Sequence, residues 1–411
     1  MLQEKTVPRS LYEDALGRHL GTPEIKVLTG VRRCGKSTLL KSVACRIQDE
    51  GFPSENIFFR RFDEFGMPVN PDANWLLSQI EDALQKANPS FPFRVFLDEV
   101  QEVSGWEKVV RQLYTRPNTE VFITGSNAYI LSSELATFLA GRYVEIPVYP
   151  LGFTEYLEFA RAFGRDCSSL DEVFSRFLTF GGMPGLFHLA DDCPSIEESL
   201  SSVFDAVILN DVARRSTVTD LDLLTKLVRY VFSTSGSLFS TKGIADALTS
   251  AGRKTKPDTI DSYLYALVQA FALCGCEQAG LAGKAILRPL LKWYPVDTGL
   301  RNLSTGFSGQ DLGYQLENVV YMELRRRGYR VFVGTLPKGE VDFVAERRSE
   351  RAYFQVTTSV LDEGVYAREL SPLERIGDSF PKTVLTLDGW KSGVTATGIR
   401  LQKLTDWLLG A

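Results

Sequence analysis

The chain has 411 residues, of which 44% are hydrophobic and 24% charged, and its formal net charge is −5. These ordinary globular values exclude long disordered segments, and the charge excludes a uniformly basic nucleic-acid binder. The length exceeds what one hydrophobic core supports, so we expect roughly two to four domains. The six cysteines show no CxxC spacing and the chain has two histidines, which excludes a disulfide framework and a zinc site; we expect buried free thiols.

The first predicted elements surround a glycine-rich loop. Residues 1 to about 24 have the spacing of a helical lead-in, and a short apolar strand, Val27–Thr29, follows. The next residues have the pattern G-x-x-x-x-G-K-S and open a helix that runs to about Gln48. The predicted nucleotide-binding residues are Gly30, Arg33, Cys34, Gly35, Lys36, Ser37 and Thr38.

This pattern has a physical reason at its main positions. Glycines let backbone N–H groups surround a polyphosphate, and the helix N-terminus adds its positive end. Lys36 is placed to reach the β- and γ-phosphates, and the Ser37 hydroxyl is placed to ligate Mg²⁺. The alternative is a chance glycine loop before a surface helix, but the flanking strand and helix favour a nucleoside triphosphate site, with ATP as the expected nucleotide.

Two adjacent carboxylates end a later strand. After a strand at Asn56–Phe62 and a helix at Trp75–Ala87, the apolar run from Phe93 ends in Asp98 and Glu99. We expect Asp98 to hold Mg²⁺ and Glu99 to polarise the water that attacks the γ-phosphate. An apolar run ending in Asp-Glu is by itself an ordinary strand exit. Downstream of a phosphate loop it favours hydrolysis over mere binding.

A polar tip ends the next strand. A helix is predicted at Trp106–Leu113 and a strand at Glu120–Asn127. At its tip a hydroxyl or amide can sense the γ-phosphate by hydrogen bonding, and Ser126 is preferred over Asn127 for this role. The alternative is that both residues only cap the next predicted helix, Tyr129–Ala140.

A strand at Tyr143–Val148 completes a regular alternation of strands and helices from residue 25 to residue 150. Such alternation predicts a largely parallel, three-layer α/β sheet, with the phosphate site at the carboxyl ends of its strands.

These motifs together resemble a known family. The residues that carry the resemblance are the phosphate loop from Lys26 to Ser37, Leu97-Asp98-Glu99, Thr124-Gly125-Ser126, Leu139-Ala140-Gly141-Arg142-Tyr143 and Pro150-Leu151-Gly152-Phe153. Over nearly its whole length the chain is similar to prokaryotic AAA+ ATPases of the archaeal and bacterial mobile-element type. The resemblance implies four parts, namely a P-loop AAA+ core at 1–150, a helical lid at 151–217, a winged helix at 218–300 and a PD-(D/E)xK nuclease-like α/β domain at 301–411.

The resemblance also implies roles for single residues. Arg142, before the fifth strand, matches the arginine-finger position, and Pro184 belongs to a Gly-x-Pro turn that is similar to the lid turn packing on the nucleotide base. Arg214 or Arg215 is the candidate lid arginine sensor. On the sequence alone, the Gly-x-Pro is equally an ordinary turn between helices.

The middle of the chain changes to short helices followed by two strands. Helices are predicted at Thr154–Ala162, Leu170–Phe180, Ile196–Val212, Leu221–Ser233, Ser240–Ser250 and Asp258–Ala270, and strands at Leu273–Cys276 and Leu291–Val296. Ser240 and Asp258 are expected to be N-caps. From residue 221 onward, this order is that of a winged helix.

Positive charge gathers in this winged-helix segment. Between Asp222 and Lys292 there are nine Lys or Arg residues and five Asp or Glu residues, a surplus of +4 against the sign of the whole chain. The predicted DNA phosphate contacts are Arg253, Lys254, Lys256, Lys284 and Arg288. The alternative is a winged helix that only packs against protein, but the local charge favours DNA.

The last segment predicts a helix at Leu316–Leu324 and strands at 329–333, 339–345 and 351–357. By the resemblance, Glu317 and Asp342 would be metal ligands. The second strand should then supply an acid and a lysine, but Gln355 and Thr357 stand there. We therefore expect no nucleic-acid cleavage, unless a lysine from elsewhere, such as Lys338, replaces the missing one.

These observations combine into one expectation. We expect an ATP- and Mg²⁺-dependent AAA+ ATPase that acts on duplex, branched or four-way (Holliday) junction DNA as a homo-oligomer such as a hexamer. The sequence shows no signal core and no membrane-spanning run, so we expect a cytoplasmic protein without a membrane partner. The alternatives are a nucleotide-controlled switch acting on a protein partner, and a nuclease gated by ATP.

Overall fold

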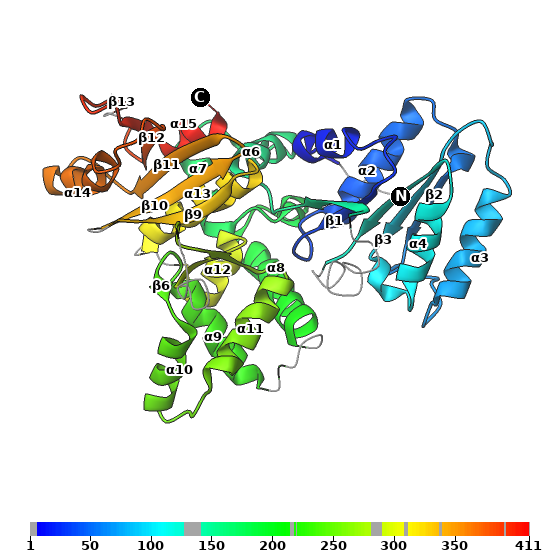
Figure 1. Ribbon diagram of the computed structural model, residues 1–411, viewed down its shortest axis with the longest axis horizontal. Coiled ribbons are helices and arrows are strands. Elements are labelled where there is room, and N and C mark those ends of the chain that lie inside the picture. Colours follow the sequence, from blue (N-terminus) through cyan, green and yellow to red (C-terminus); the bar gives the residue numbers. More distant parts are fainter. Residues whose placement is uncertain are drawn as a thin grey trace. The chain divides into compact units, whose positions relative to one another are not determined.

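The computed structural model describes residues 6–126, 141–213, 218, 220–280, 290–307, 311–336, 339–389 and 392–410. The chain divides into two compact units (Figure 1), Met1–Tyr149 with Gln269–Phe271, and Pro150–Val268 with Ala272–Ala411. The first unit contains nearly all of the predicted ATPase core at 1–150, and the three predicted parts that follow it lie in the second unit apart from Gln269–Phe271. Their separation into lid, winged helix and nuclease-like domain stays a prediction.

The first unit is built on a five-stranded sheet. Its elements are α1 (Ser10–Gly17), β1 (Ile25–Thr29), α2 (Lys36–Asp49), η1 (Ser54–Asn56), β2 (Ile57–Arg61), α3 (Ala73–Leu84), β3 (Phe93–Asp98), η2 (Val100–Glu102), α4 (Trp106–Thr115), β4 (Thr119–Thr124) and β5 (Tyr143–Pro147). The strand order is β2-β3-β4-β1-β5 and every neighbouring pair is parallel. The predicted parallel sheet is confirmed.

Burial explains why these strands form. All five residues of β1 are buried, as expected for a central parallel strand covered on both faces. Helix α3 begins two residues earlier than predicted because the Asp72 side chain accepts a hydrogen bond from the Trp75 amide at 2.8 Å and so caps the helix. Leu76 and Ile80 of that helix join the core beside Val109 and Val110 of α4.

The second unit begins with helices. These are α6 (Phe153–Ala162), α7 (Leu170–Phe180), η4 (Pro184–His188), α8 (Cys193–Asp205), the π-helical η5 (Ala206–Ala213), α9 (Leu221–Ser233), α10 (Thr241–Ser250), α11 (Pro257–Gln269) and α12 (Thr298–Thr305). Three short strands, β6 (Leu238–Phe239), β7 (Leu273–Cys276) and β8 (Leu291–Pro295), form an antiparallel sheet in the order β6-β8-β7.

The predicted N-caps of α10 and α11 can be compared with the structure. Ser240 is an N-cap, since its Oγ accepts the Gly243 amide at 3.1 Å. The prediction that Asp258 is an N-cap is wrong. Helix α11 already begins at Pro257, whose fixed φ suits the first helical position, so Asp258 lies inside the first turn.

A six-stranded mixed sheet dominates the C-terminal part (Figure 1, orange to red). Its elements are α13 (Leu312–Arg326), β9 (Arg330–Thr335), β10 (Glu340–Arg347), β11 (Glu350–Thr357), α14 (Glu363–Glu374), β12 (Lys382–Thr386), β13 (Gly393–Val394), β14 (Arg400–Lys403) and α15 (Leu404–Leu409). The order is β13-β14-β12-β11-β10-β9, with β9, β10 and β11 antiparallel and β12 parallel to both β11 and β14.

Two general expectations can also be compared with the structure. All six cysteines are free thiols, but only Cys34 and Cys276 are buried, and Cys45 and Cys193 are exposed, so the expectation of buried thiols is wrong for the exposed pair. Among the described residues, no helix combines the length and apolar character that a membrane span requires.

Several predicted positions lie outside the described residues. They are Asn127, the helix at Tyr129–Ala140, Arg214, Arg215, Lys284, Arg288 and Lys338.

Candidate functional site

The glycine-rich loop leaves β1 and packs closely on the end of β5. Gly30 has a φ of +143°, and a Cβ there would lie 2.1 Å from the Val148 carbonyl oxygen, so only glycine fits. The Cys34 Sγ donates to the same oxygen at 3.2 Å. Gly35, with a φ of +100°, then turns the chain into α2. The sequence therefore places a left-handed turn at the start of a helix, the geometry in which backbone N–H groups can surround an anion.

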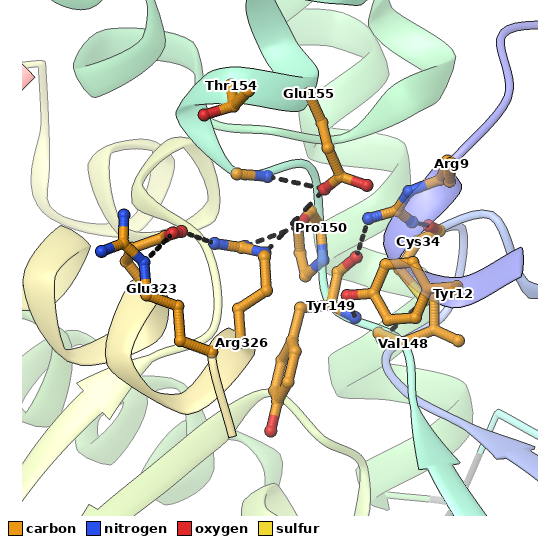
Figure 2. Close-up of polar contacts among 12 residues, drawn as sticks. Arg9, Tyr12, Cys34, Val148, Tyr149, Pro150, Thr154, Glu155, Glu323 and Arg326 are labelled. Atoms are coloured by element: carbon orange, nitrogen blue, oxygen red, sulfur yellow. Dashed lines mark hydrogen bonds and ion pairs between the residues drawn. The ribbon is translucent and has the colours of Figure 1, made fainter. Parts of the chain in front are cut away.

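Arg9 supports this loop from the residue before α1. Its guanidinium is 5% exposed and donates to the carbonyl oxygens of Cys34 and Tyr149, each at 2.9 Å (Figure 2). The Tyr12 hydroxyl accepts the Tyr149 amide at 3.0 Å. One buried cation thus links the loop to the segment that follows β5. Sequence reasoning missed Arg9, because nothing in its local pattern separates it from a surface arginine.

Lys36 is buried and bent back onto the loop. Its Nζ donates to the carbonyl oxygens of Gly30 at 2.8 Å and Val31 at 3.1 Å. An ammonium group has three donors, so the loop oxygens hold it in place and leave one donor for a phosphate oxygen. This is the position that the predicted role of Lys36 requires.

Ser37 and Asp98 meet, although 61 residues separate them in the chain. The Ser37 Oγ donates to Asp98 Oδ1 at 3.0 Å, and Thr124 Oγ1 donates to the same oxygen at 2.5 Å. Asp98 is fully buried, and among the described residues its Oδ2 has no hydrogen-bond partner; Arg61 Nε lies 3.8 Å from this oxygen. Burial raises the pKa of Asp98, against the hydrogen bonds from Thr124 and Ser37.

This arrangement fits a Mg²⁺ ion. Magnesium binds hard oxygen ligands, often one or two protein oxygens together with water and phosphate. The Ser37 hydroxyl and Asp98 Oδ2, which no described residue hydrogen-bonds, supply that donor set. A buried carboxylate oxygen without a partner is costly, and a bound cation would remove that cost.

Glu99 follows directly at the end of β3. Its backbone is left-handed, with a φ of +55°, and its amide donates to Thr124 Oγ1 at 3.0 Å. The Glu99 carboxylate accepts a hydrogen bond from Gln101. Thr124 therefore fixes both adjacent acids, Asp98 through its side chain and Glu99 through its backbone. Sequence reasoning missed Thr124, since only the sheet order shows that β3 and β4 are neighbours, and it also missed the local contact of Gln101 with Glu99.

Ser126 lies just beyond β4, on the same carboxyl-terminal edge of the sheet as Asp98. It is fully buried, and among the described residues its Oγ has no hydrogen-bond partner. The sensor role stays a prediction.

Arg142 lies at the opposite edge of the sheet. Its carbonyl oxygen accepts the Ile25 amide at 2.9 Å, at the amino-terminal start of β1, and its guanidinium lies 5.4 Å from the centre of the Tyr114 ring. In a parallel sheet the amino ends of the strands face away from the phosphate loop. Arg142 therefore points to no phosphate of its own chain, and an arginine-finger role requires a neighbouring chain.

Pro184 begins η4 after a tightly held turn. A Cβ at Gly182 would lie 2.2 Å from the Leu151 carbonyl oxygen, and the Gly182 amide donates to Asp297 Oδ2 at 2.7 Å. Burial raises the pKa of Asp297 to about 6, against its backbone hydrogen bonds. These contacts explain the glycine of the Gly-x-Pro turn structurally, and base packing by Pro184 stays a prediction.

Arg326 holds the start of the second unit. It donates from Nη2 to the Pro150 carbonyl oxygen at 2.9 Å and from Nη1 to Glu323 Oε2 at 2.6 Å, and its Nε lies 3.8 Å from Glu155 Oε2 (Figure 2). The Gly152 amide donates to the same Glu155 oxygen at 3.0 Å. This network is a structural anchor that sequence reasoning did not identify.

The predicted DNA contacts are placed unequally. Arg253 forms ion pairs with Asp220, at 2.5 Å, and with Asp222. Lys254 and Lys256 are exposed. Lys292, which contributes to the basic surplus of the sequence, is buried.

The predicted C-terminal metal ligands do come together. A cavity of about 770 Å³ is lined by Glu317, Asp342, Gln355 and Thr357 among other residues. Lys292 of β8 reaches the same carboxylates, a contact that sequence reasoning missed.

Comparison with protein families identifies two regions. Residues 22–157 match the model of an AAA domain, and residues 171–311 match that of a domain of unknown function, DUF8612. The AAA match contains the glycine-rich loop, Asp98 and Glu99. The second match extends across the boundary predicted between lid and winged helix.

Individual proteins extend the similarity. An uncharacterized protein of Haemophilus influenzae is 36% identical over 410 residues, covering 99% of this chain and 100% of that protein. Uncharacterized protein MJ1544 of Methanocaldococcus jannaschii is 31% identical and covers 78% of this chain and 72% of its own length. The structure of the Walker-type ATPase PABY2304 of Pyrococcus abyssi covers 74% of this chain and 97% of its own, with 17% identity and a TM-score of 0.51. That structural likeness concerns the fold.

Proposed function

This chain belongs to one family with the Haemophilus influenzae protein and carries an AAA domain, and we propose that it hydrolyses ATP with Mg²⁺. The observation that supports this most strongly is the contact of Ser37 with Asp98, whose other carboxylate oxygen lacks a hydrogen-bond partner in the part of the chain that the structure describes. Two residues far apart in the sequence thus supply the oxygen ligands that a magnesium nucleotide needs.

Each residue of the site then has a separate task. Lys36 and the loop amides bind the β- and γ-phosphates, and Ser37 and Asp98 would hold the metal ion. The bound ion neutralises negative charge on the phosphates. Glu99 orients the attacking water and accepts its proton, Gln101 holds the Glu99 carboxylate, and Ser126 donates to the γ-phosphate as it leaves.

We propose further that the active form is a homo-oligomer. Arg142 lies at the sheet edge opposite its own phosphate loop, so it completes the site of a neighbouring chain, where it stabilises charge on the transferring phosphoryl group. Pro184 and a lid arginine, Arg214 or Arg215, are proposed to contact the same nucleotide from the lid.

We propose that the ATPase acts on DNA. Residues 218–300 are proposed to be a winged helix, since α9, α10 and α11 are followed by the antiparallel pair β7 and β8, with β6 at its edge. Lys254 and Lys256 precede α11 and are exposed, which suits contacts to phosphates. Lys284 and Arg288 are proposed to contact the same duplex.

One observation favours the alternative, a nucleotide-controlled switch on a protein partner. Of the basic residues that suggest DNA, Lys292 is buried and Arg253 is already paired with two carboxylates, which reduces the positive surface. A switch needs slow hydrolysis and no track, so DNA would leave its ATPase rate unchanged.

The test is phosphate release with Mg²⁺, with and without single-stranded, duplex, forked and four-way DNA, together with gel shifts of the same DNAs. We expect Mg²⁺-dependent hydrolysis that DNA stimulates. If no ATP is hydrolysed at high protein concentration, the proposed ATPase activity is wrong. Hydrolysis that no DNA stimulates, with no DNA binding, would favour the switch.

A further inference from the structure

A cluster of opposite charges lies at the cavity of the C-terminal part, where Glu317 and Asp342 line the cavity wall. Glu317 comes from α13 and Asp342 from β10, and their side chains are 12% and 9% exposed. Lys292 comes from β8 of the three-stranded sheet and its side chain is 2% exposed. All three residues belong to the second unit. The cluster therefore joins two sheets of that unit through buried charges.

Lys292 acts as the cation of this cluster. Its Nζ lies 3.0 Å from Glu317 Oε1, 2.9 Å from Glu340 Oε1 and 3.8 Å from Asp342 Oδ1. Three carboxylates thus surround one ammonium group, as hard oxygen ligands surround a metal ion.

Two of these carboxylates also accept hydrogen bonds from other groups. The Tyr294 hydroxyl donates to Glu317 Oε1 at 2.5 Å, and the Val356 amide donates to Asp342 Oδ2 at 2.8 Å. Gln355, at the position where a metal-binding acid is expected, donates from Nε2 to Glu369 Oε2 at 2.9 Å. Its side-chain oxygen accepts the Asp342 amide at 3.3 Å. An amide at position 355 thus completes hydrogen bonds instead of adding a ligand charge.

We propose that Lys292 permanently occupies the position of the divalent cation that the nuclease-like resemblance implies, so that this site takes no metal ion. The residues present do not fit the metal. Gln355 stands where the resemblance expects an acid, and the carboxylates of Glu317, Glu340 and Asp342 already share the Lys292 ammonium group.

The position of Lys292 in β8 keeps its ammonium group among the carboxylates. Lys292 and Tyr294 alternate with Trp293 along β8, so both face Glu317, while the strand is held by β6 on one side and β7 on the other. A metal ion would have to displace an ammonium group that is 2% exposed and leave it buried without its carboxylates, which is strongly unfavourable. The cluster thus serves as a connection between the two sheets and lacks the ion that activates water in metal-dependent hydrolysis.

The test is Tb³⁺ binding, read as luminescence excited through nearby tyrosines such as Tyr294 and Tyr314. An Asp98→Asn background removes the proposed metal ligand of the first unit. In this background alone we expect no saturable signal that depends on Asp342. Adding Lys292→Met should create one site per chain that binds at least about tenfold more tightly, because uncompensated buried carboxylates attract a cation. Adding Asp342→Asn as well should abolish that site.

The matched control is Lys382→Met. Lys382 lies in the same six-stranded sheet as Asp342, its Nζ is 3.9 Å from Asp378 Oδ1, and neither Lys382 nor Asp378 lines the cavity. It should create no site. Saturable, Asp342-dependent binding with Lys292 intact would overturn the proposal, and this arm is decisive even if Lys292→Met fails to fold. A folded Lys292→Met chain that binds no ion would also overturn it, because the cluster would then not be a cation site. None of these outcomes depends on ATP hydrolysis.

Discussion

Each unit of this protein places a buried lysine in a polar site with carboxylates. The two sites differ in which oxygen atoms the lysine contacts. Lys36 donates to two loop carbonyls and leaves Asp98 Oδ2 without a hydrogen-bond partner among the described residues. Lys292 contacts three carboxylates directly. We propose that the first site takes a cation from solution, whereas in the second site the Lys292 ammonium group already lies among the carboxylates. Residue type alone does not distinguish them.

The pKa shifts follow the same difference. Burial raises the pKa of Asp98, and Arg61 Nε lies 3.8 Å from its Oδ2. For Lys292, burial disfavours the ammonium, but Glu317, Asp342 and Glu340 together raise its pKa above the ordinary value. The ammonium is therefore the stable form of Lys292 over the whole neutral range.

The largest expected effect concerns Arg142, because the first site is proposed to need a second chain while the Lys292 cluster is complete within one. Arg142→Ala should lower the ATPase rate by roughly 10³–10⁵-fold without weakening ATP binding. Wild-type activity should rise more than linearly with protein concentration, measured by phosphate release. Mixing inactive Arg142→Ala and Glu99→Gln chains should restore some activity. A fully active monomer would refute the shared site.

The next effect separates binding from chemistry within the first site. Glu99→Gln should bind ATP but hydrolyse it about 10²–10⁴-fold more slowly, because it removes the group that accepts the proton of water. Lys36→Ala should abolish tight ATP binding, measured by calorimetry. The matched controls are the exposed neighbours Glu102→Gln and Lys41→Ala, which should behave as wild type. Hydrolysis by Glu99→Gln at the wild-type rate contradicts the assignment.

Sequence reasoning reached the first site because its chemistry is written in local spacing. The loop from Gly30 to Ser37 and the strand ending in Asp98 and Glu99 are contiguous patterns. Thr124 was missed as the hydrogen-bond partner of both Asp98 and Glu99, because the sheet order that brings β4 beside β3 is a tertiary property. Arg9 was missed for a similar reason, since its two carbonyl partners lie 25 and 140 positions away.

The second site shows the opposite limit. Its acids, Glu317 and Asp342, were predicted together, but only by resemblance. The sequence places Lys292 in a basic surplus that suggests DNA, while the fold buries it against Glu317, 25 positions later. A lysine in a short apolar strand gives no local sign of its partner. The resemblance therefore indicated a metal site where the packing provides an internal ion pair.

The Lys292 cluster should matter for the stability of the fold and leave ATP hydrolysis unaffected. Lys292→Met should lower the free energy of unfolding by about 3–5 kcal/mol, since it leaves buried carboxylates without a counter-charge, while the ATPase rate per folded chain stays unchanged. Chemical denaturation measures this. Lys382→Met, which breaks a less buried pair, should cost about 0–1 kcal/mol. Equal losses in the two variants would contradict the buried cation.

The smallest expected effect concerns the exposed lysines of the same basic segment. Neutralising Lys254 and Lys256 should weaken binding to all DNA sequences alike and reduce the slope of log affinity against log salt by about one unit per lost contact. Arg253→Gln, at the third predicted contact, should reduce that slope less than either lysine variant, because Arg253 is also paired with Asp220 and Asp222. An unchanged slope for the lysine pair would mean that this face contacts protein.

The most direct test of the contrast between the two sites is to count Mn²⁺ ions by electron paramagnetic resonance in the presence of a non-hydrolysable ATP analogue. The account predicts one nucleotide-dependent ion per chain, lost in Asp98→Asn and retained in Asp342→Asn. An ion that survives Asp98→Asn and disappears in Asp342→Asn would contradict it.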